Sequence, residues 1–203
     1  MPGHKASEDA SRRQIVRAAY DIASREGLAG LTVRRVATRA GLSTGLVLFH
    51  FTTKEGLVVA LLDYVLETTT VLRITPDISA IPAPLDRLLA LLRQEMLRLA
   101  SEPRRLRLFF DFWAKGLTEP LVRMKMQAEL DRYREALRPI AADVLAAEPE
   151  RFVGVTAHGL AAVAVSVIKG CAVQSMIDPA HFDIDEFLAA TTGLMGQFAR
   201  VAD

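Results

Sequence analysis

The sequence predicts an all-α protein of about nine helices. The strong helix formers Ala, Leu, Arg and Glu recur throughout the chain, whereas residues typical of strands are few. Apolar residues also return at steps of three and four, which is the period of a helix with one buried face. With 203 residues, of which 51% are hydrophobic, the chain can bury a substantial core. We expect a small domain over residues 1–56 and a larger helical domain over residues 57–203.

The first predicted helix follows Ser7 or Ser11, either of which can serve as its N-cap. Gly27 ends this helix, because glycine readily leaves the helical conformation. Its inward stripe consists of Ile15, Ala18, Ala19 and Ile22.

Two short helices follow, separated by a tight turn that contains glycine. Thr32 is the predicted N-cap of the first, and Gly41 ends it. Ser43 then caps the second. A connection this short between two helices is typical of a helix-turn-helix. The apolar stripe of the first short helix is Val33, Val36, Ala37 and Ala40.

Thr53 begins a longer fourth helix, and proline residues divide the rest of the chain. The segment 75–84, TPDISAIPAP, has no helical stripe and is predicted to be a loop. Pro139 lies inside a long stretch and can kink it. Five further helices have boundaries at Pro84, Pro103, Pro120, Pro149 and the turn at residues 177–185.

Several function classes are disfavoured by composition. The apolar segment 152–168 is shorter than the ~20 residues that cross a bilayer, so we expect a buried or interface helix and no membrane partner. The single cysteine, Cys171, fits a reducing cytoplasm. No two of the histidines share metal-ligand spacing, so we expect no metal, no cofactor and no enzyme.

The charge is distributed unevenly along the chain. Residues 1–56 hold nine basic and five acidic residues, a balance of +4, so the remainder carries −3 against the total of +1. This asymmetry indicates a small cationic module that meets a polyanion.

The stretch GLSTG over residues 41–45 fits the Gly-x-Ser-x-Gly pattern of a hydrolase nucleophile. That turn needs a buried strand before the serine, whereas here the preceding segment has a helical period. Ser43 is therefore expected to be a helix cap, and no catalytic residue is predicted. A serine hydrolase that uses Ser43 stays an alternative.

The segment 42–51 instead suits a recognition helix that enters the major groove of DNA. Its inward side is filled by Leu42, Val47 and Phe51. Its other side displays Thr44, Gly45, Leu46, Leu48, Phe49 and His50.

Residues 12–58, RRQIVRAAYDIASREGLAGLTVRRVATRAGLSTGLVLFHFTTKEGLV, resemble the N-terminal DNA-binding domain of TetR-family transcriptional repressors. The turn, the caps and their spacing agree together over roughly residues 10–60. The resemblance implies that Thr32 and the start of the recognition helix hold phosphates, and that Arg34 reaches a guanine edge. The predicted DNA contacts are Thr32, Arg34, Ser43, Thr44, Gly45, Leu46, Leu48, Phe49, His50 and Lys54.

Two of these positions depart from the family pattern, because Leu46 and Leu48 stand where hydrogen-bonding residues are common. They can touch thymine methyls instead, as can Phe49. Two questions stay open: whether Arg35 and Arg39 hold phosphates or lie in solvent, and whether Lys5, Arg12 and Arg13 form an ordered arm near the minor groove.

The larger domain is expected to bind a small effector, as the resemblance implies. Its bulky residues at helical spacing are either core or the lining of an apolar cavity. The candidate effector contacts are Leu92, Met96, Phe109, Phe112, Trp113, Met126, Leu130 and Tyr133. Arg104, Arg105 and Arg107 can meet an anionic head group, for example of an acyl-CoA, or lie in solvent.

A palindromic DNA operator requires two DNA-binding domains, one for each half-site, so the sequence predicts a homodimer. The helix around 152–176 and the final helix over 187–201 supply the apolar area for its interface. A helical protein-interaction module without DNA contact remains the alternative, and it predicts no salt-dependent affinity for DNA.

Overall fold

The computed structural model describes residues 2–68 and 72–197, and these residues form helices joined by turns and loops, without a strand. The all-α prediction is confirmed. The elements group into two compact units. The first unit comprises Met1–Thr69 and Arg104–Met126, and the second comprises Thr70–Pro103 and Gln127–Asp203.

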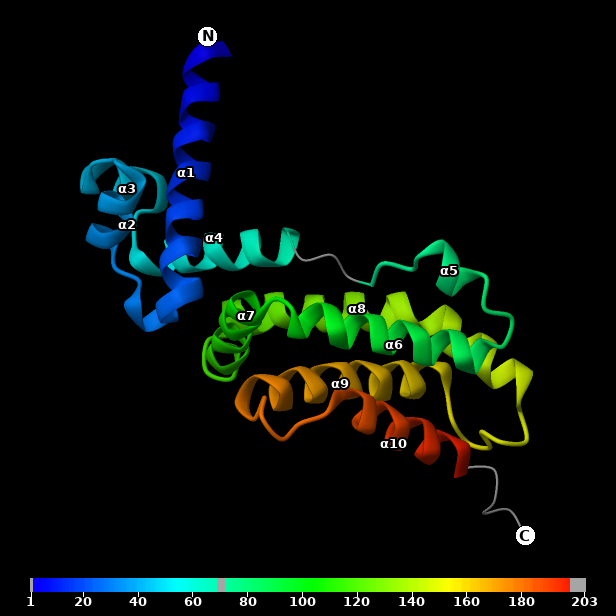
Figure 1. The fold of residues 1–203 in the computed structure, drawn as a ribbon. Helices are drawn as coiled ribbons and strands as arrows, with labels where there is room; N and C mark the ends of the chain where they lie inside the picture. Colours follow the sequence, from blue (N-terminus) through cyan, green and yellow to red (C-terminus); the bar gives the residue numbers. More distant parts are fainter. Residues whose placement is uncertain (1, 69–71, 198–203) are drawn as a thin grey trace. The chain divides into compact units, whose positions relative to one another are not determined.

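The first unit contains the N-terminal helices and one helix from later in the chain (Figure 1). Its elements are α1 (Pro2–Glu26), the 3-10 turn η1 (Leu28–Gly30), α2 (Val33–Ala40), α3 (Thr44–Phe51), α4 (Lys54–Glu67) and most of α7 (Pro103–Gly116). The start of α8 (Pro120–Ala147) also belongs to it.

This grouping differs from the predicted boundary at residue 56, and the core of the first unit explains the difference. Leu108 and Phe112 of α7 are fully buried in the same apolar cluster as Ile15 of α1 and Leu61 of α4. The side chain of Asp111 also accepts a hydrogen bond from the backbone N–H of Leu28, at 3.1 Å. The N-terminal helices are therefore completed by residues far away in sequence.

The start of α1 differs from the prediction. The helix already begins at Pro2, and the hydroxyl of Ser11 donates to the carbonyl of Ser7 within it, at 3.0 Å. Neither serine is an N-cap, because serine can bond to the carbonyl one turn earlier inside a helix. Arg12 is therefore on a helix, with its guanidinium 5.3 Å from the centre of the Phe51 ring. The side chain of Lys5 lies outside the described residues.

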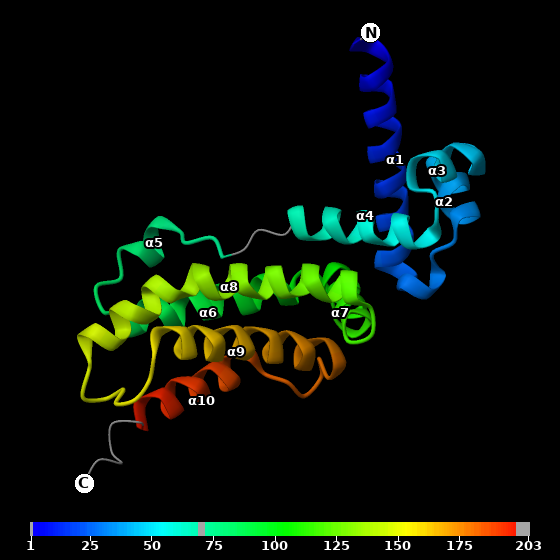
Figure 2. The same cartoon turned by 180° about the vertical axis from the view of Figure 1, so that it is seen from behind.

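The second unit is built from α6 (Pro84–Ala100), the rest of α8, α9 (Ala157–Ile177) and α10 (Ile184–Gln197). Both views show α6, α8 and α9 side by side, with α10 against α9 (Figure 2). Pro139 is accommodated inside α8. The predicted final helix is described only to residue 197, and the remainder of that segment lies outside the described residues.

The predicted loop over 75–84 was partly wrong, because it contains the short helix α5 (Pro76–Ser79). Proline at the first helical position costs no hydrogen bond, since that N–H has no partner inside a helix. Ile78 is buried, and the short helix packs against α6 within the second unit.

Among the described residues, α9 is the one single helix that is long and apolar enough to cross a membrane. It has 21 residues, and its most apolar 18-residue window has a mean hydropathy of 1.8 and is 44% buried inside the protein. The bent pair α3 and α4, at 72°, passes the same test only when the two are counted together. Core helices have these properties too.

Candidate nucleic-acid interface

The turn between α2 and α3 is built as the sequence predicts. Gly41 takes the left-handed conformation, with φ 66°, and ends α2. The next N–H, of Leu42, donates to the carbonyl of Ala37 at 3.0 Å. This arrangement satisfies the carbonyl groups that the end of a helix leaves free. It lets α3 start after only Leu42 and Ser43.

Side-chain caps fix where α2 and α3 start. The hydroxyl oxygen of Thr32 accepts the N–H of Arg35 at 3.3 Å, and that of Ser43 accepts the N–H of Leu46 at 3.1 Å. Both caps are exposed. The remaining N–H groups of each first turn point outward at the positive end of the helix dipole, which is where a phosphate oxygen is stabilised. The strand required by the hydrolase alternative is absent, since the described segment before Ser43 is α2.

The two sides of α3 differ sharply in exposure. Val47 and Phe51 are 1% and 7% exposed and anchor the helix to the core of the first unit. On the other side, Leu48 is 42% exposed and Phe49 is 69% exposed. Thr44 and Gly45 are also exposed, whereas Leu42, Leu46 and His50 are half-buried. The prediction therefore agrees with the structure for Val47 and Phe51 inside and for Thr44, Gly45, Leu48 and Phe49 outside. It does not separate Leu42, predicted inside, from Leu46 and His50, predicted outside, because all three are half-buried.

His50 sits between its neighbours Phe49 and Phe51, with ring centres 5.4 Å and 6.2 Å away. Its Nε2 atom is buried and has no hydrogen-bond partner among the described residues. The ring thus packs along the helix more than it projects from it. Lys54, at the start of α4, is exposed, next to the cap that Thr53 makes with the N–H of Gly56 at 3.0 Å.

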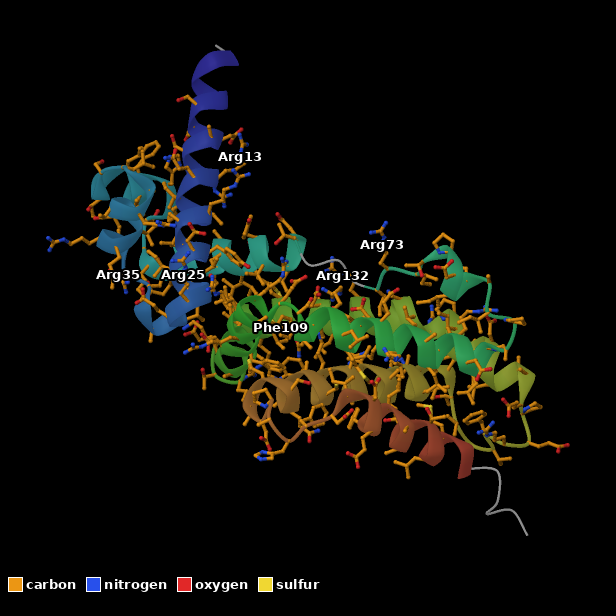
Figure 3. All side chains as sticks on the ribbon, viewed as in Figure 1. Arg13, Arg25, Arg35, Arg73, Phe109 and Arg132 are labelled. Carbon is orange, nitrogen blue, oxygen red and sulfur yellow. The ribbon has the colours of Figure 1, made fainter. Side chains whose placement is uncertain are left out.

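Arg35 and Arg39 form exposed ion pairs with residues of α1. Arg35 donates to both carboxylate oxygens of Glu26, at 2.7 Å and 2.5 Å, and to the carbonyl of Gly30 at 2.8 Å. The hydrogen bond from Arg35 lowers the pKa of Glu26 below its ordinary value. Arg39 pairs with Asp21 at 2.8 Å. Figure 3 labels Arg35 among the side chains of the first unit.

Arg34, by contrast, is exposed and takes part in no ion pair found among the described residues. Its guanidinium is therefore available to a partner, whereas the guanidinium groups of Arg35 and Arg39 brace α2 against α1.

The predicted effector contacts do not come together in one unit. Phe109, Phe112, Trp113 and Met126 belong to the apolar core of the first unit or pack against it. Leu92, Met96, Leu130 and Tyr133 lie in the second unit. The three arginines of α7 also differ, since Arg105 donates to the carbonyl of Val65 and the hydroxyl of Thr68, at 3.0 Å and 2.9 Å, and Arg104 and Arg107 are exposed.

Sequence reasoning missed a group of buried charged residues in the second unit. Glu95 of α6 is 0% exposed, Glu129 of α8 is 4% exposed and Lys169 of α9 is 7% exposed. Burial lowers the pKa of Lys169 to about 8, and Arg98 acts in the same direction, while Glu129 and Glu95 oppose the shift. Burial likewise raises the pKa of Tyr133 to about 12. The sequence does carry a signal for each residue, because each lies among apolar residues at helical spacing: Glu95 between Leu92 and Leu99, Glu129 one turn before Tyr133, and Lys169 in the apolar stretch that becomes α9.

Comparison with known proteins decides the family. The model of bacterial regulatory proteins of the tetR family matches residues 15–61. The model of the BetI-type transcriptional repressor C-terminal domain matches residues 84–197, more than half of the chain. The chain belongs to the TetR family of transcriptional regulators. It is a transcriptional regulator and not an enzyme.

Among curated relatives, the TetR-family chain is 25% identical to the regulator BetI of Cronobacter sakazakii over 191 residues, which is 92% of this chain and 89% of the relative. It is 30% identical to BetI of Stenotrophomonas maltophilia over 118 residues, which is 57% of this chain and 59% of the relative. Members of the family bind DNA and small-molecule effectors, usually as dimers.

Solved structures of TetR-type regulators share the fold. A transcriptional regulator from Rhodococcus sp. Rha1 aligns with a TM-score of 0.67 at 23% identity, covering 92% of this chain and 95% of that chain. A putative regulator from Saccharomonospora viridis, solved in complex with choline, aligns with a TM-score of 0.67 at 16% identity, covering 93% and 96%.

Proposed function

We propose that this TetR-family regulator is a repressor that binds a palindromic operator as a homodimer in the cytoplasm, and that a small effector releases it. The observation that carries the DNA-reading part is the exposed apolar side of α3, with Phe49 69% exposed on a helix whose other side is anchored. Large apolar side chains exposed together typically mark a contact surface. Leu46, Leu48 and Phe49 would meet thymine methyl groups in the major groove.

The proposed phosphate contacts lie around this apolar surface. Thr32, Ser43 and Thr44 would hold phosphate oxygens at the starts of α2 and α3, and Lys54 would do so at the start of α4. Arg34 would reach a guanine edge, because it is the exposed arginine of α2 without an ion pair among the described residues. Gly45 would let the backbone of α3 approach the DNA closely.

The homodimer would be formed through α9 and α10. Both helices keep exposed apolar side chains after the second unit has formed its core: Val163 is 51%, Ile177 is 74% and Leu194 is 64% exposed. A two-fold pair would place two α3 helices about 34–36 Å apart, which is one turn of DNA.

Two classes of effector are candidates. A lipophilic compound such as an acyl-CoA would use Leu92, Met96, Leu130 and Tyr133 for its tail, with Phe109, Phe112, Trp113 and Met126 as the other predicted contacts. A small organic cation is the second candidate, and it is supported by the buried carboxylates of Glu95 and Glu129 and by the choline-bound structure of a protein with the same fold. A cation there would compete with Arg98, which pairs with Glu95, and with Arg132, which pairs with Glu129.

The experiment is selection of bound sequences from random duplex DNA, followed by titration of the selected duplex at several salt concentrations. We expect a palindrome and an affinity that falls steeply with salt. Arg34→Ala should weaken binding of the cognate duplex by about 1–3 kcal/mol, whereas Arg73→Ala should not, because Arg73 lies in the second unit, before α5 (Figure 3). Recovery of no motif, together with salt-independent affinity, would favour the interaction-module alternative.

A further inference from the structure

A groove lies between α1 and α4 within the first unit. Its volume is about 340 Å³, which is within the range of small-molecule sites. Arg13 projects from α1 on the side toward which α4 extends (Figure 3). We call this space the α1–α4 groove, and its lining consists of Arg12, Arg13, Val16, Arg17, Ala60, Asp63, Tyr64, Glu67 and Thr68.

The α1 wall of the groove carries three guanidinium groups. Arg13 and Arg17 are exposed, lie one helical turn apart and make no hydrogen bond or ion pair among the described residues. Arg12 is also exposed, and its guanidinium lies 5.3 Å from the centre of the Phe51 ring. Stacking on a ring leaves the N–H groups at the edge of a guanidinium free to donate. This wall therefore offers several donors to an anion.

The α4 wall balances only part of this positive charge. Asp63 already pairs with Lys125 of α8. Glu67 is exposed and has no ion pair among the described residues. Three guanidinium groups against the one carboxylate of Glu67 leave the lining with an excess of two positive charges. A phosphomonoester carries close to two negative charges at neutral pH, so it matches this excess better than a singly charged anion does.

The rest of the lining suits the organic part of such a ligand. Val16 and Ala60 are 5% and 7% exposed and give the groove an apolar floor. The ring of Tyr64 is held in place by an edge contact with Tyr20, with ring centres 5.5 Å apart. We propose that the α1–α4 groove binds a small phosphomonoester, whose phosphate oxygens accept hydrogen bonds from the arginines of α1 and whose organic part lies on the apolar floor.

This site goes beyond the proposed function. None of the residues that line it lies on α3 or is a predicted effector contact. A bound phosphomonoester would connect α1 with α4 inside the DNA-reading unit, independently of any effector in the second unit.

The test uses the purified full chain without DNA and two matched probes. Phenyl phosphate is a monoester, and methyl phenyl phosphate is the corresponding diester with one negative charge less. In calorimetric titration at pH 7.5 we expect phenyl phosphate to bind with a Kd of about 1 mM or lower, and at least about tenfold more tightly than the diester. Equal affinities, or no saturable binding of phenyl phosphate up to about 10 mM, would overturn the proposal.

The pH dependence is an independent measurement on the same protein. The second ionisation of a phosphomonoester has a pKa of about 6, so its doubly charged fraction rises about fourfold from pH 5.5 to pH 7.5. The affinity for phenyl phosphate should rise by about the same factor relative to that for the diester. The diester measures any contribution from the charged groups around the groove, which are Arg12, Arg13 and Arg17 of α1, Asp63 and Glu67 of α4, Arg105 of α7 and Lys125 of α8. An unchanged ratio of the two affinities contradicts binding of the doubly charged form.

Variants of the two walls should have opposite effects. Arg13→Gln and Arg17→Gln should each weaken phenyl phosphate binding about tenfold, because each removes a charged donor. Glu67→Gln should strengthen it about three- to tenfold, because it removes the opposing carboxylate. These exposed side chains make no hydrogen bond among the described residues, so the variants should fold.

Arg25→Gln is the matched control, because Arg25 is an exposed arginine of the same helix that does not line the groove. It makes the same change in net charge and should leave phenyl phosphate binding unaltered. An equal loss in Arg17→Gln and Arg25→Gln would mean that only the overall charge of the protein attracts the probe, and the proposal would be wrong.

The phosphates of DNA are the other source of the same chemistry. If Arg13→Gln and Arg17→Gln weakened binding of the selected duplex while phenyl phosphate did not bind, these arginines would contact the DNA backbone and the proposal would be wrong. Phenyl phosphate binding by a chain without affinity for DNA would overturn the proposed function and leave the site intact.

Discussion

The interior of the first unit and the interior of the second use charge in opposite ways. In the first unit the ion pairs of Arg35 and Arg39 lie at the surface, while the core around α1 is apolar. In the second unit Glu95, Glu129 and Lys169 are inside. Burying such groups costs free energy, so a chain that keeps them gives up stability for binding or specificity. The comparison separates a unit with an apolar core and surface ion pairs from a unit with charged side chains in its interior.

The largest expected effect tests whether α7 really completes the apolar core of the first unit. Phe112→Ala should lower the free energy of unfolding by about 3–5 kcal/mol, because Phe112 is 0% exposed and its removal leaves a cavity. Chemical denaturation measures this. Leu117→Ala, just after α7 and 69% exposed, is the control and should change stability by less than about 0.5 kcal/mol. If Phe112→Ala and Leu117→Ala lowered the free energy of unfolding by similar small amounts, α7 would not be part of the apolar core.

A smaller effect measures what the buried charge of Lys169 costs the second unit in stability. The folded-state pKa of Lys169 is about 8, below its ordinary 10.5, so the unfolded chain binds more protons between these pH values. Stability of the unmodified protein relative to Lys169→Met should therefore rise with pH in this window, by roughly 2 kcal/mol from pH 8 to pH 10.

Denaturation of both proteins at pH 7, 8, 9 and 10 measures this difference. Below pH 8 it should be nearly constant, because Lys169 is then protonated in both the folded and the unfolded state. A flat difference up to pH 10 would mean that Lys169 is not desolvated in the folded protein.

The smallest effect concerns the helix caps of the first unit. Ser43→Ala should cost about 1 kcal/mol, because it removes the oxygen that accepts the N–H of Leu46. Ser11→Ala should be close to neutral, since Ser11 lies inside α1. Thermal unfolding of the two variants compares them directly. A larger loss for Ser11→Ala would restore Ser11 as a structural cap.

The two regions also differ in how far the sequence predicts them. Thr32, Gly41 and Ser43 were predictable because caps and turns depend on neighbours within a few residues. The sides of α3 followed from its period, with Val47 inside and Phe49 outside. Local rules also have a limit. Serine is a preferred N-cap residue, but Ser11 lies inside α1, which begins at Pro2, and its hydroxyl donates to the carbonyl of Ser7.

The remaining features depend on contacts between residues far apart in sequence. Phe112 and Leu108 look like effector-domain residues from their position, yet they complete the core of the N-terminal helices. Glu95, Glu129 and Lys169 look like ordinary surface charges until α6, α8 and α9 pack together. The spacing of apolar residues shows which face of a helix is buried but not which other helix packs against that face. Neither arrangement could therefore be derived from one sequence.

The central claim is that the exposed side of α3 reads DNA, and one matched pair of substitutions tests it most directly. Phe49 and Leu117 are both 69% exposed and both belong to the first unit, but only Phe49 is on α3. On the selected duplex at fixed salt, Phe49→Ala should weaken binding by about 1–3 kcal/mol, and Leu117→Ala should leave it unchanged. Unchanged binding by Phe49→Ala, or an equal loss in both variants, would contradict the account.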